Sequence, residues 1–145
     1  IAPYAALSGR ADIYFSRNEF DNALADLQRL LKAQPDISSA YIRRGFINAI
    51  KNKWELAVND FRIAFEIDRR PNRIMGGILT VSYADVDRYI SKFPKTAQAY
   101  AARGFINFFR KRDADAESDF KTAFDLQPSL SDELSDLITS VKERR

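Results

Sequence analysis

The sequence predicts an all-α protein, a right-handed solenoid of stacked antiparallel helix pairs with a capping helix at the C-terminus. Residues 40–69 and 99–128 are one thirty-residue unit written twice, with twelve of the thirty aligned positions identical. Within each copy, apolar residues recur every three or four positions, which is the spacing of an amphipathic helix. Repeated units of this length stack side by side, each burying the face that its neighbour leaves open.

The first unit, about residues 4–37, predicts two helices joined by a short turn. Apolar residues follow helical spacing from Leu7 to Phe15 and again from Phe20 to Leu31. The turn falls at residues 16–19, where Asn18 supplies turn chemistry. The second helix should stop before Pro35, since the residue ahead of a proline disfavours helical geometry.

The second unit, about residues 38–71, follows the same plan. Ser38 or Ser39 is suited to cap a helix that runs to about Ile50. Residues 51–53 make the turn, and residues 54–67 form the second helix. The last full unit, about residues 97–130, repeats this pattern.

The middle unit, about residues 72–96, predicts a shortened pair. The two copies begin at residues 40 and 99, and this separation is not a multiple of one helix-pair length. The remaining residues suffice for a short helix near 72–80 and another near 84–92, ending at Pro94. After the last unit, apolar residues form one stripe that predicts a capping helix over 131–143: Leu130, Leu134, Leu137, Ile138 and Val141. We treat residues 1–145 as a single domain.

The composition argues against an enzyme. The chain has no histidine and no cysteine, so the usual general base, the thiol nucleophile and the commonest transition-metal ligands are missing. It also lacks a phosphate-binding glycine loop and a nucleophile elbow. We therefore expect no catalytic residues, no metal site and no cofactor. The formal net charge of +3 is modest, so nucleic acid is not the expected partner.

The sequence constrains the cellular compartment of the protein only weakly. No stretch reaches the roughly 18 consecutive apolar residues of a transmembrane helix, which predicts a soluble protein. The chain starts at Ile1 without a signal pattern, so Ile1 is interpreted as a segment boundary or a processed terminus. The style of the repeats, with Arg-Gly in the first helix and Asp-Phe in the second, resembles bacterial proteins. Cytoplasm and periplasm both remain open.

The repeated residues resemble the tetratricopeptide repeat family. The second unit carries the motif as Tyr41, Arg44, Gly45, Asn48, Ala57, Phe61 and Ala64, and the last unit as Tyr100, Arg103, Gly104, Asn107, Ala116, Phe120, Ala123 and Pro128. Gly45 and Gly104 should let the two helices of a pair approach closely. The first unit is a looser copy, and Asn48 and Asn107 stand where the family usually has tyrosine. The resemblance covers about residues 4–128 and implies a solenoid that binds peptides or proteins on its concave face.

An apolar strip is the first candidate binding site. The repeat pattern directs a set of side chains to the concave face: Asp12, Phe15, Ile42, Arg43, Phe46, Ala49, Ile50, Ala101, Phe105, Phe108 and Phe109. An exposed strip of this kind usually marks an interaction site, here for a protein or peptide segment. The alternative is ordinary core. The shortened unit would then tighten the superhelix until facing groups touch, or the 130–143 helix would fold into the groove.

Basic turns are the second candidate site. Lys51 and Lys53 occupy one turn, and Arg110, Lys111 and Arg112 occupy the equivalent turn of the other copy. Stacked on one edge, these turns would form a basic ridge for an acidic protein or nucleic acid. The alternative is that inter-helix turns are solvated and tolerate charge. Homo-oligomerisation through the apolar strip is a third hypothesis.

Overall fold

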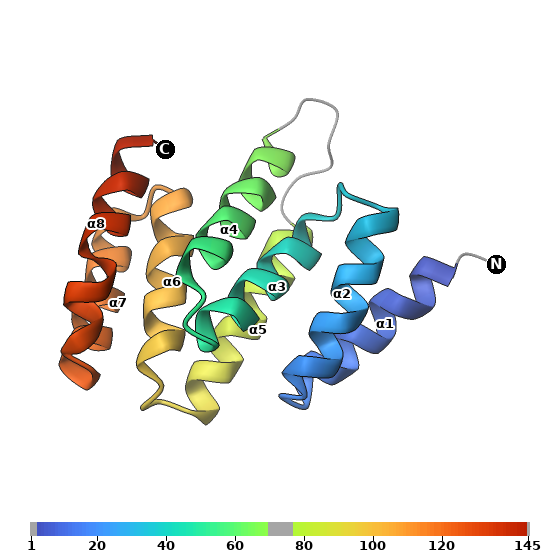
Figure 1. Ribbon diagram of the computed structural model, residues 1–145, viewed down its shortest axis with the longest axis horizontal. Coiled ribbons are helices and arrows are strands. Elements are labelled where there is room, and N and C mark those ends of the chain that lie inside the picture. The colour runs from blue at the N-terminus through green and yellow to red at the C-terminus, as the bar shows by residue number, and fades with distance from the viewer. Residues whose placement is uncertain (1–2, 70–76, 145) are drawn as a thin grey trace.

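The computed structural model describes residues 3–69 and 77–144, and in these ranges the chain forms helices and no strand (Figure 1). The helices are α1 (Pro3–Ser16), α2 (Phe20–Ala33), α3 (Ser38–Ile50), α4 (Trp54–Asp68), α5 (Gly77–Lys92), α6 (Ala97–Phe109), α7 (Asp113–Leu126) and α8 (Ser129–Arg144). The all-α class, the helix pairs of the first, second and last units and the C-terminal helix are confirmed. None of the described helices is long and apolar enough to cross a membrane.

Three helix pairs, α1–α2, α3–α4 and α6–α7, are closed by the same turn. Each turn holds one residue in the left-handed region: Asn18 at φ 60°, Asn52 at φ 62° and Lys111 at φ 61°. In the second pair, the Asn52 N–H bonds to the Ala49 carbonyl at 2.9 Å, and the Lys53 N–H bonds to the Asn48 carbonyl at 2.8 Å. These bonds satisfy carbonyls that the end of α3 would otherwise leave unpaired.

Within each duplicated pair, a glycine permits close contact between the helices. A Cβ atom built on Gly45 would lie 2.6 Å from the Phe61 ring, and one built on Gly104 would lie 2.9 Å from the Phe120 ring. Neither approach leaves space for a methyl group. The small-residue expectation from the sequence is therefore confirmed at both glycines.

The middle unit differs from the sequence prediction. Residues 77–92 form one continuous helix, α5, whereas two short helices with a break near residue 82 were expected. No glycine or proline lies between Ile78 and Lys92 to break it. The expected start of the first short helix, at residues 72–76, lies outside the described residues.

The single helix α5 reverses the direction of everything that follows it. Figure 1 shows the chain running alternately down and up: α3 descends, α4 ascends, α5 descends and α6 ascends. The duplicated helices α3 and α6 pack directly against each other and run in opposite directions. Among the described residues, α5 alone lies between the two hairpins, and neighbouring helices in short-loop bundles run antiparallel, so one intervening helix reverses the second hairpin.

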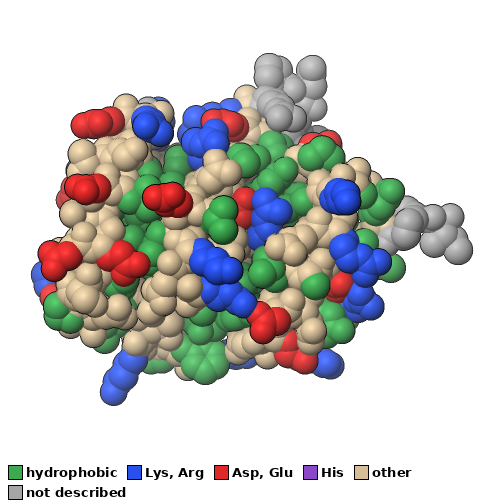
Figure 2. All heavy atoms as spheres, in the orientation of Figure 1, with side chains coloured by type: hydrophobic (Ala, Val, Ile, Leu, Met, Phe, Trp, Pro, Cys, Tyr) green, Lys and Arg blue, Asp and Glu red, His purple; other side chains and the backbone are tan. Residues whose placement is uncertain are grey.

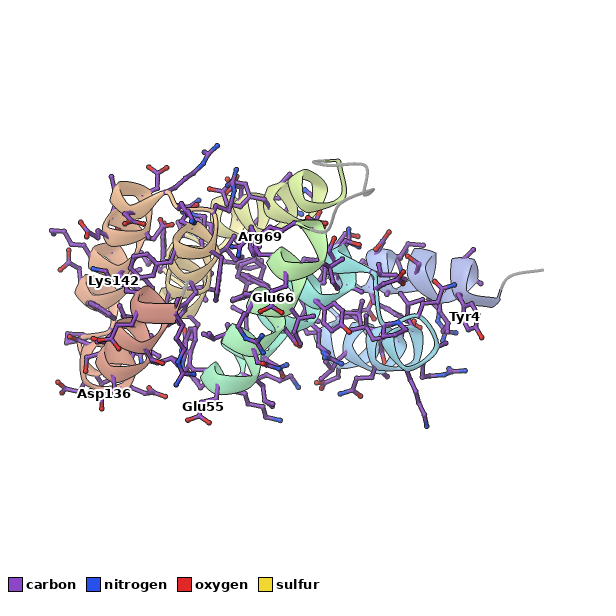
Figure 3. The ribbon with its side chains drawn as sticks, turned by 90° about the horizontal axis from the view of Figure 1, so that it is seen from above. Tyr4, Glu55, Glu66, Arg69, Asp136 and Lys142 are labelled. Atoms are coloured by element: carbon purple, nitrogen blue, oxygen red, sulfur yellow. The ribbon has the colours of Figure 1, made fainter. Side chains whose placement is uncertain are left out.

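The helices lie on two sides of α3 and α6. Figures 1 and 3 show α2, α4 and α8 on one side and α1, α5 and α7 on the other. Buried residues from all eight described helices form a single hydrophobic core. Packing of neighbouring helix pairs is consistent with a helical repeat, while the right-handed superhelix stays a prediction.

Candidate functional site

The apolar residues of the predicted strip lie in the core. Nearly all are buried, with exposed fractions of 8% or less: Phe15, Ile42, Phe46, Ala49, Ala101, Phe105, Phe108 and Phe109. Ile50 is half-buried. The expectation that they form an exposed strip is wrong. Their burial agrees with the alternative that the strip is ordinary core, and for the first copy the covering helix is α5, which belongs to the shortened middle unit.

Aromatic contacts show how the strip is covered. Tyr89 of α5 packs against the Phe46 ring with centroids 5.2 Å apart, and against Phe20 at 5.7 Å. In the second copy, Trp54 covers Phe105 at 6.0 Å, and Phe65 stacks on Phe109 at 5.8 Å. The chain's own aromatic side chains therefore occupy the face on which a partner was expected.

The two charged members of the strip belong to an ion network that holds α5. Arg43 is buried and pairs with Asp12 of α1 at 2.5 Å and with Asp85 of α5 at 3.0 Å. Arg88 approaches the same Asp85 carboxylate at 2.5 Å. Burial raises the pKa of Asp12 above its ordinary value, because desolvation outweighs the attraction of Arg43. This network joins α1, α3 and α5.

The basic turns do not form a ridge. Figure 1 places the α3–α4 turn at the lower edge of the molecule and the α6–α7 turn at the upper edge, because α5 has reversed the second copy. Two of the cations are also engaged, Lys51 with Asp21 and Arg110 over the Tyr83 ring at 4.2 Å. Lys53, Lys111 and Arg112 are exposed. The expectation of one aligned basic edge is therefore wrong.

A repeated arginine–aspartate fork was missed by the sequence analysis. In each hairpin an arginine of the first helix donates two bonds to a buried aspartate of the second: Arg44 to Asp60 at 2.9 and 2.8 Å, and Arg103 to Asp119 at 3.0 and 2.8 Å. Arg10 and Asp26 repeat it at 2.8 and 2.7 Å. The constant separation of sixteen residues is the signal that could have revealed the pairs. The forks lock hairpins and are structural.

In the second copy, the fork extends to α5. Arg103 also contacts Asp87 at 2.9 Å. Burial lowers the pKa of Arg103, but the bonds and charges of Asp119 and Asp87 outweigh burial and keep this pKa above its ordinary value. Arg103 therefore remains charged and joins α5, α6 and α7.

An open groove lies between α4 and α8, over the C-terminal end of α6. We call it the α4–α8 groove. It consists of two cavities of about 370 and about 520 Å³ that share Glu55 and Leu137. Its lining comprises Asn52, Trp54, Glu55, Val58, Asn59, Arg62, Glu66 and Arg69 from the α4 side, Phe109 from α6, and Glu133, Asp136, Leu137, Ser140, Val141 and Arg144 from α8.

The floor of the groove is apolar and its rims are charged. Val58, Phe109 and Val141 lie at the floor and are buried. The rim residues Glu55, Arg62 and Arg144 are exposed. Figure 3 shows Glu55 of α4 and Asp136 of α8 projecting from the same side of the molecule. Figure 2 views this side and shows carboxylates gathered over α8, with lysines and arginines more numerous over α4 and α2.

The groove could not be found from the sequence because it needs α8 beside α4. Only the reversed second copy brings these helices to the same side of α6. Of the residues named from the sequence for the apolar strip or the basic edge, only Phe109 lines the groove. Leu137 and Val141 were assigned to the apolar stripe of the capping helix without a binding role.

No group of three or more potential metal-ligating side chains occurs in residues 3–69 and 77–144. The groove offers apolar surface, carboxylates and guanidinium groups, which suit recognition of another polypeptide. No family model matches this chain, and no curated protein matches it in sequence.

Proposed function

We propose that this protein is a non-catalytic protein-interaction scaffold, a divergent tetratricopeptide-like module, and that it binds a partner segment in the α4–α8 groove. The groove itself carries the proposal, since it combines an apolar floor with charged rims at the surface. Interaction sites commonly have an apolar centre and a polar rim of this kind. The recurring hairpin with Gly45 against Phe61 supports the family relationship.

This proposal moves the site from the face named by the sequence to a different one. The apolar strip packs against α5, Trp54 and Phe65, so a partner there would have to displace the protein's own core. The basic turns lie at opposite edges, which removes the geometric basis for electrostatic binding along one ridge. The α4–α8 groove requires no displacement of core residues.

Site-specific photo-crosslinking tests the proposal. Benzoylphenylalanine placed at Ser140 or Asn59 would report contacts in the groove, and the same group at Lys121 on α7 is the matched control. We expect a discrete crosslinked partner from both groove positions in the native cell and none from Lys121. Equal products from Lys121, or none from either groove position, would contradict the proposal. A product containing two copies of this chain would indicate homo-oligomerisation.

A further inference from the structure

The α4–α8 groove extends along the whole length of α4. Its two cavities follow α4 from Glu55, in the first turn, to Arg69, just after the last. A 15-residue helix such as α4 is about 22 Å long at a rise of 1.5 Å per residue. A partner helix of about four turns would therefore span the groove, with its apolar face on Val58, Phe109 and Val141.

The charges of the groove are separated along its length. Two carboxylates, Glu55 and Glu133, lie in the first two turns of α4 and α8, and Asp136 lies near the middle of α8; we call this half of the groove the carboxylate end. Three arginines lie toward the end where both helices finish, which we call the arginine end: Arg62, Arg69 and Arg144. A carboxylate also lies at that end: Glu66 bonds to Arg62 at 2.8 Å and offsets its charge, and Arg69 donates to the Phe109 carbonyl at 3.4 Å. The groove therefore keeps positive charge at Arg69 and Arg144 and negative charge at its other end.

From this polarity we propose that the groove binds an amphipathic helix of a partner protein, acidic in its first half and basic in its second, running antiparallel to α4 and α8. This inference rests on the proposed function and specifies its partner. The acidic half would face Arg69 and Arg144, and the basic half would face Glu55, Glu133 and Asp136. An antiparallel partner also opposes the dipoles of α4 and α8, which run in the same direction.

The same charges disfavour other occupants. A second copy of this chain could offer α8, which begins with Asp132 and ends with Lys142 and Arg144. However, the apolar face of α8 is engaged, with Leu130 and Leu134 fully buried in its own fold. A small anion would meet the arginine end but would leave the carboxylate end and the apolar floor uncovered. A separate helix uses all three features.

Two sixteen-residue peptides, both stapled to equalise their helical content, test the inference with the 145-residue chain. One carries Asp and Glu in its first half and Lys and Arg in its second; the other has the same composition and apolar face with the charges interleaved. By fluorescence anisotropy at low salt, we expect the segregated peptide to bind about tenfold more tightly. The difference should shrink at high salt, because the rim charges are exposed.

Orientation is read by a nitroxide on the N-terminus of the segregated peptide. We expect paramagnetic broadening of amide signals near Arg69 and Arg144 and none near Glu133. The variant Glu55→Arg, Glu133→Arg, Asp136→Arg should abolish the preference for the segregated peptide. The charge-reversed pair Lys121→Asp, Asp125→Lys on α7 is the folded control and should retain that preference.

The outcomes separate this inference from the proposed function. Equal affinity for both peptides, or broadening at the carboxylate end, overturns the proposed charge pattern and orientation of the bound helix. It leaves a groove that binds helices. If neither peptide binds while Ser140 still crosslinks a partner, only the proposal that the bound segment is a helix is overturned. Binding of neither peptide with no crosslink at Ser140 overturns both. Self-crosslinking at Ser140, with a dimer in light scattering, identifies a second copy as the occupant and also overturns the inference.

Discussion

The two copies of the duplicated unit share one local structure and have opposite orientations. Helices α3 and α4 form the same hairpin as α6 and α7, with the same glycine contact, the same fork and the same left-handed turn conformation. Yet α3 runs down the molecule and α6 runs up it (Figure 1). The repeat therefore encodes the hairpin, and the number of helices between the copies determines how the hairpins are placed.

The positions at which the copies differ show how each copy is adapted to its surroundings. Arg43 in the first copy corresponds to Ala102 in the second. Arg43 reaches Asp85 of α5, whereas Ala102 is fully buried. Ala49 and Ile50 correspond to Phe108 and Phe109, and Phe109 lies at the floor of the α4–α8 groove. Placement is thus supported by a few side chains outside the conserved hairpin pattern.

Removing the Arg43 side chain should have the largest effect on stability. We expect Arg43→Ala to lower the free energy of unfolding by about 3 kcal/mol, because it removes the buried partner that donates two hydrogen bonds to the buried Asp85 carboxylate. Urea denaturation measures this loss, and hydrogen exchange should quicken in α5. The control Arg88→Ala removes an exposed partner of the same carboxylate and should cost under about 1 kcal/mol. Equal losses for the two variants would contradict the assigned role of Arg43.

The shared glycines offer a matched test of the hairpin itself. We expect Gly45→Ala and Gly104→Ala each to destabilise by about 1–3 kcal/mol, since the new methyl group overlaps a core phenylalanine ring. Gly45 should cost more, because its Cβ would also lie 3.0 Å from the Ala57 carbonyl oxygen. Thermal unfolding of both variants provides the measurement.

Gly9 is the control for those substitutions. A Cβ atom there meets nothing within 4 Å, so Gly9→Ala should stabilise α1 by about 0.5–1 kcal/mol through helix propensity alone. Stabilisation by alanine at Gly45 would show that the hairpin does not depend on close helix approach.

The predictable part of the fold was the part encoded locally. Asn18, Pro35 and the spacing of Leu27, Leu30 and Leu31 place the first hairpin without any long-range information. The path of the chain after residue 69 depends on whether the middle unit contains one helix or two, and the helix-pair pattern of the neighbouring units favoured two. The reversal of α6, the dispersal of the basic turns and the α4–α8 groove all follow from that count.

The sequence could not decide between exposure and burial of the apolar strip for a related reason. Phe46 and Phe105 have the spacing of groove residues, and the hydrophobic pattern of a helix does not distinguish an external partner from a neighbouring helix of the same chain. Tyr89 and Asp85 identify α5 as the neighbour only once its position is known.

The pH dependence of stability tests whether the arginine–aspartate fork also stabilises the α1–α2 hairpin, which lies outside the duplicated unit. The bond from Arg10 lowers the pKa of Asp26 below its ordinary value. Because the native pKa lies below the unfolded one, the fork stabilises the protein above about pH 4 and loses this contribution as pH falls through the native value.

We expect the melting temperature of the Asp26→Asn variant to be lower at pH 7, reflecting a loss of about 1 kcal/mol after allowance for the exposure of Arg10. The gap between variant and wild type should narrow as the pH falls below about 4. A gap that stays constant over this range would show that the ionised fork contributes nothing to stability.

The smallest expected effect is at the turn, where the two copies carry different residues in one conformation. Asn52 and Lys111 are equivalent and have φ values of 62° and 61°, a region that asparagine adopts more readily than lysine. We expect Lys111→Asn to stabilise by about 0.5–1 kcal/mol and Asn52→Lys to destabilise by a similar amount in chemical denaturation. Lys111→Ala removes the charge while keeping the strain, so it should give no gain. If alanine stabilised as much as asparagine, relief of charge repulsion among Arg110, Lys111 and Arg112 would explain the effect, and the turns of the two copies would not share the same backbone constraint.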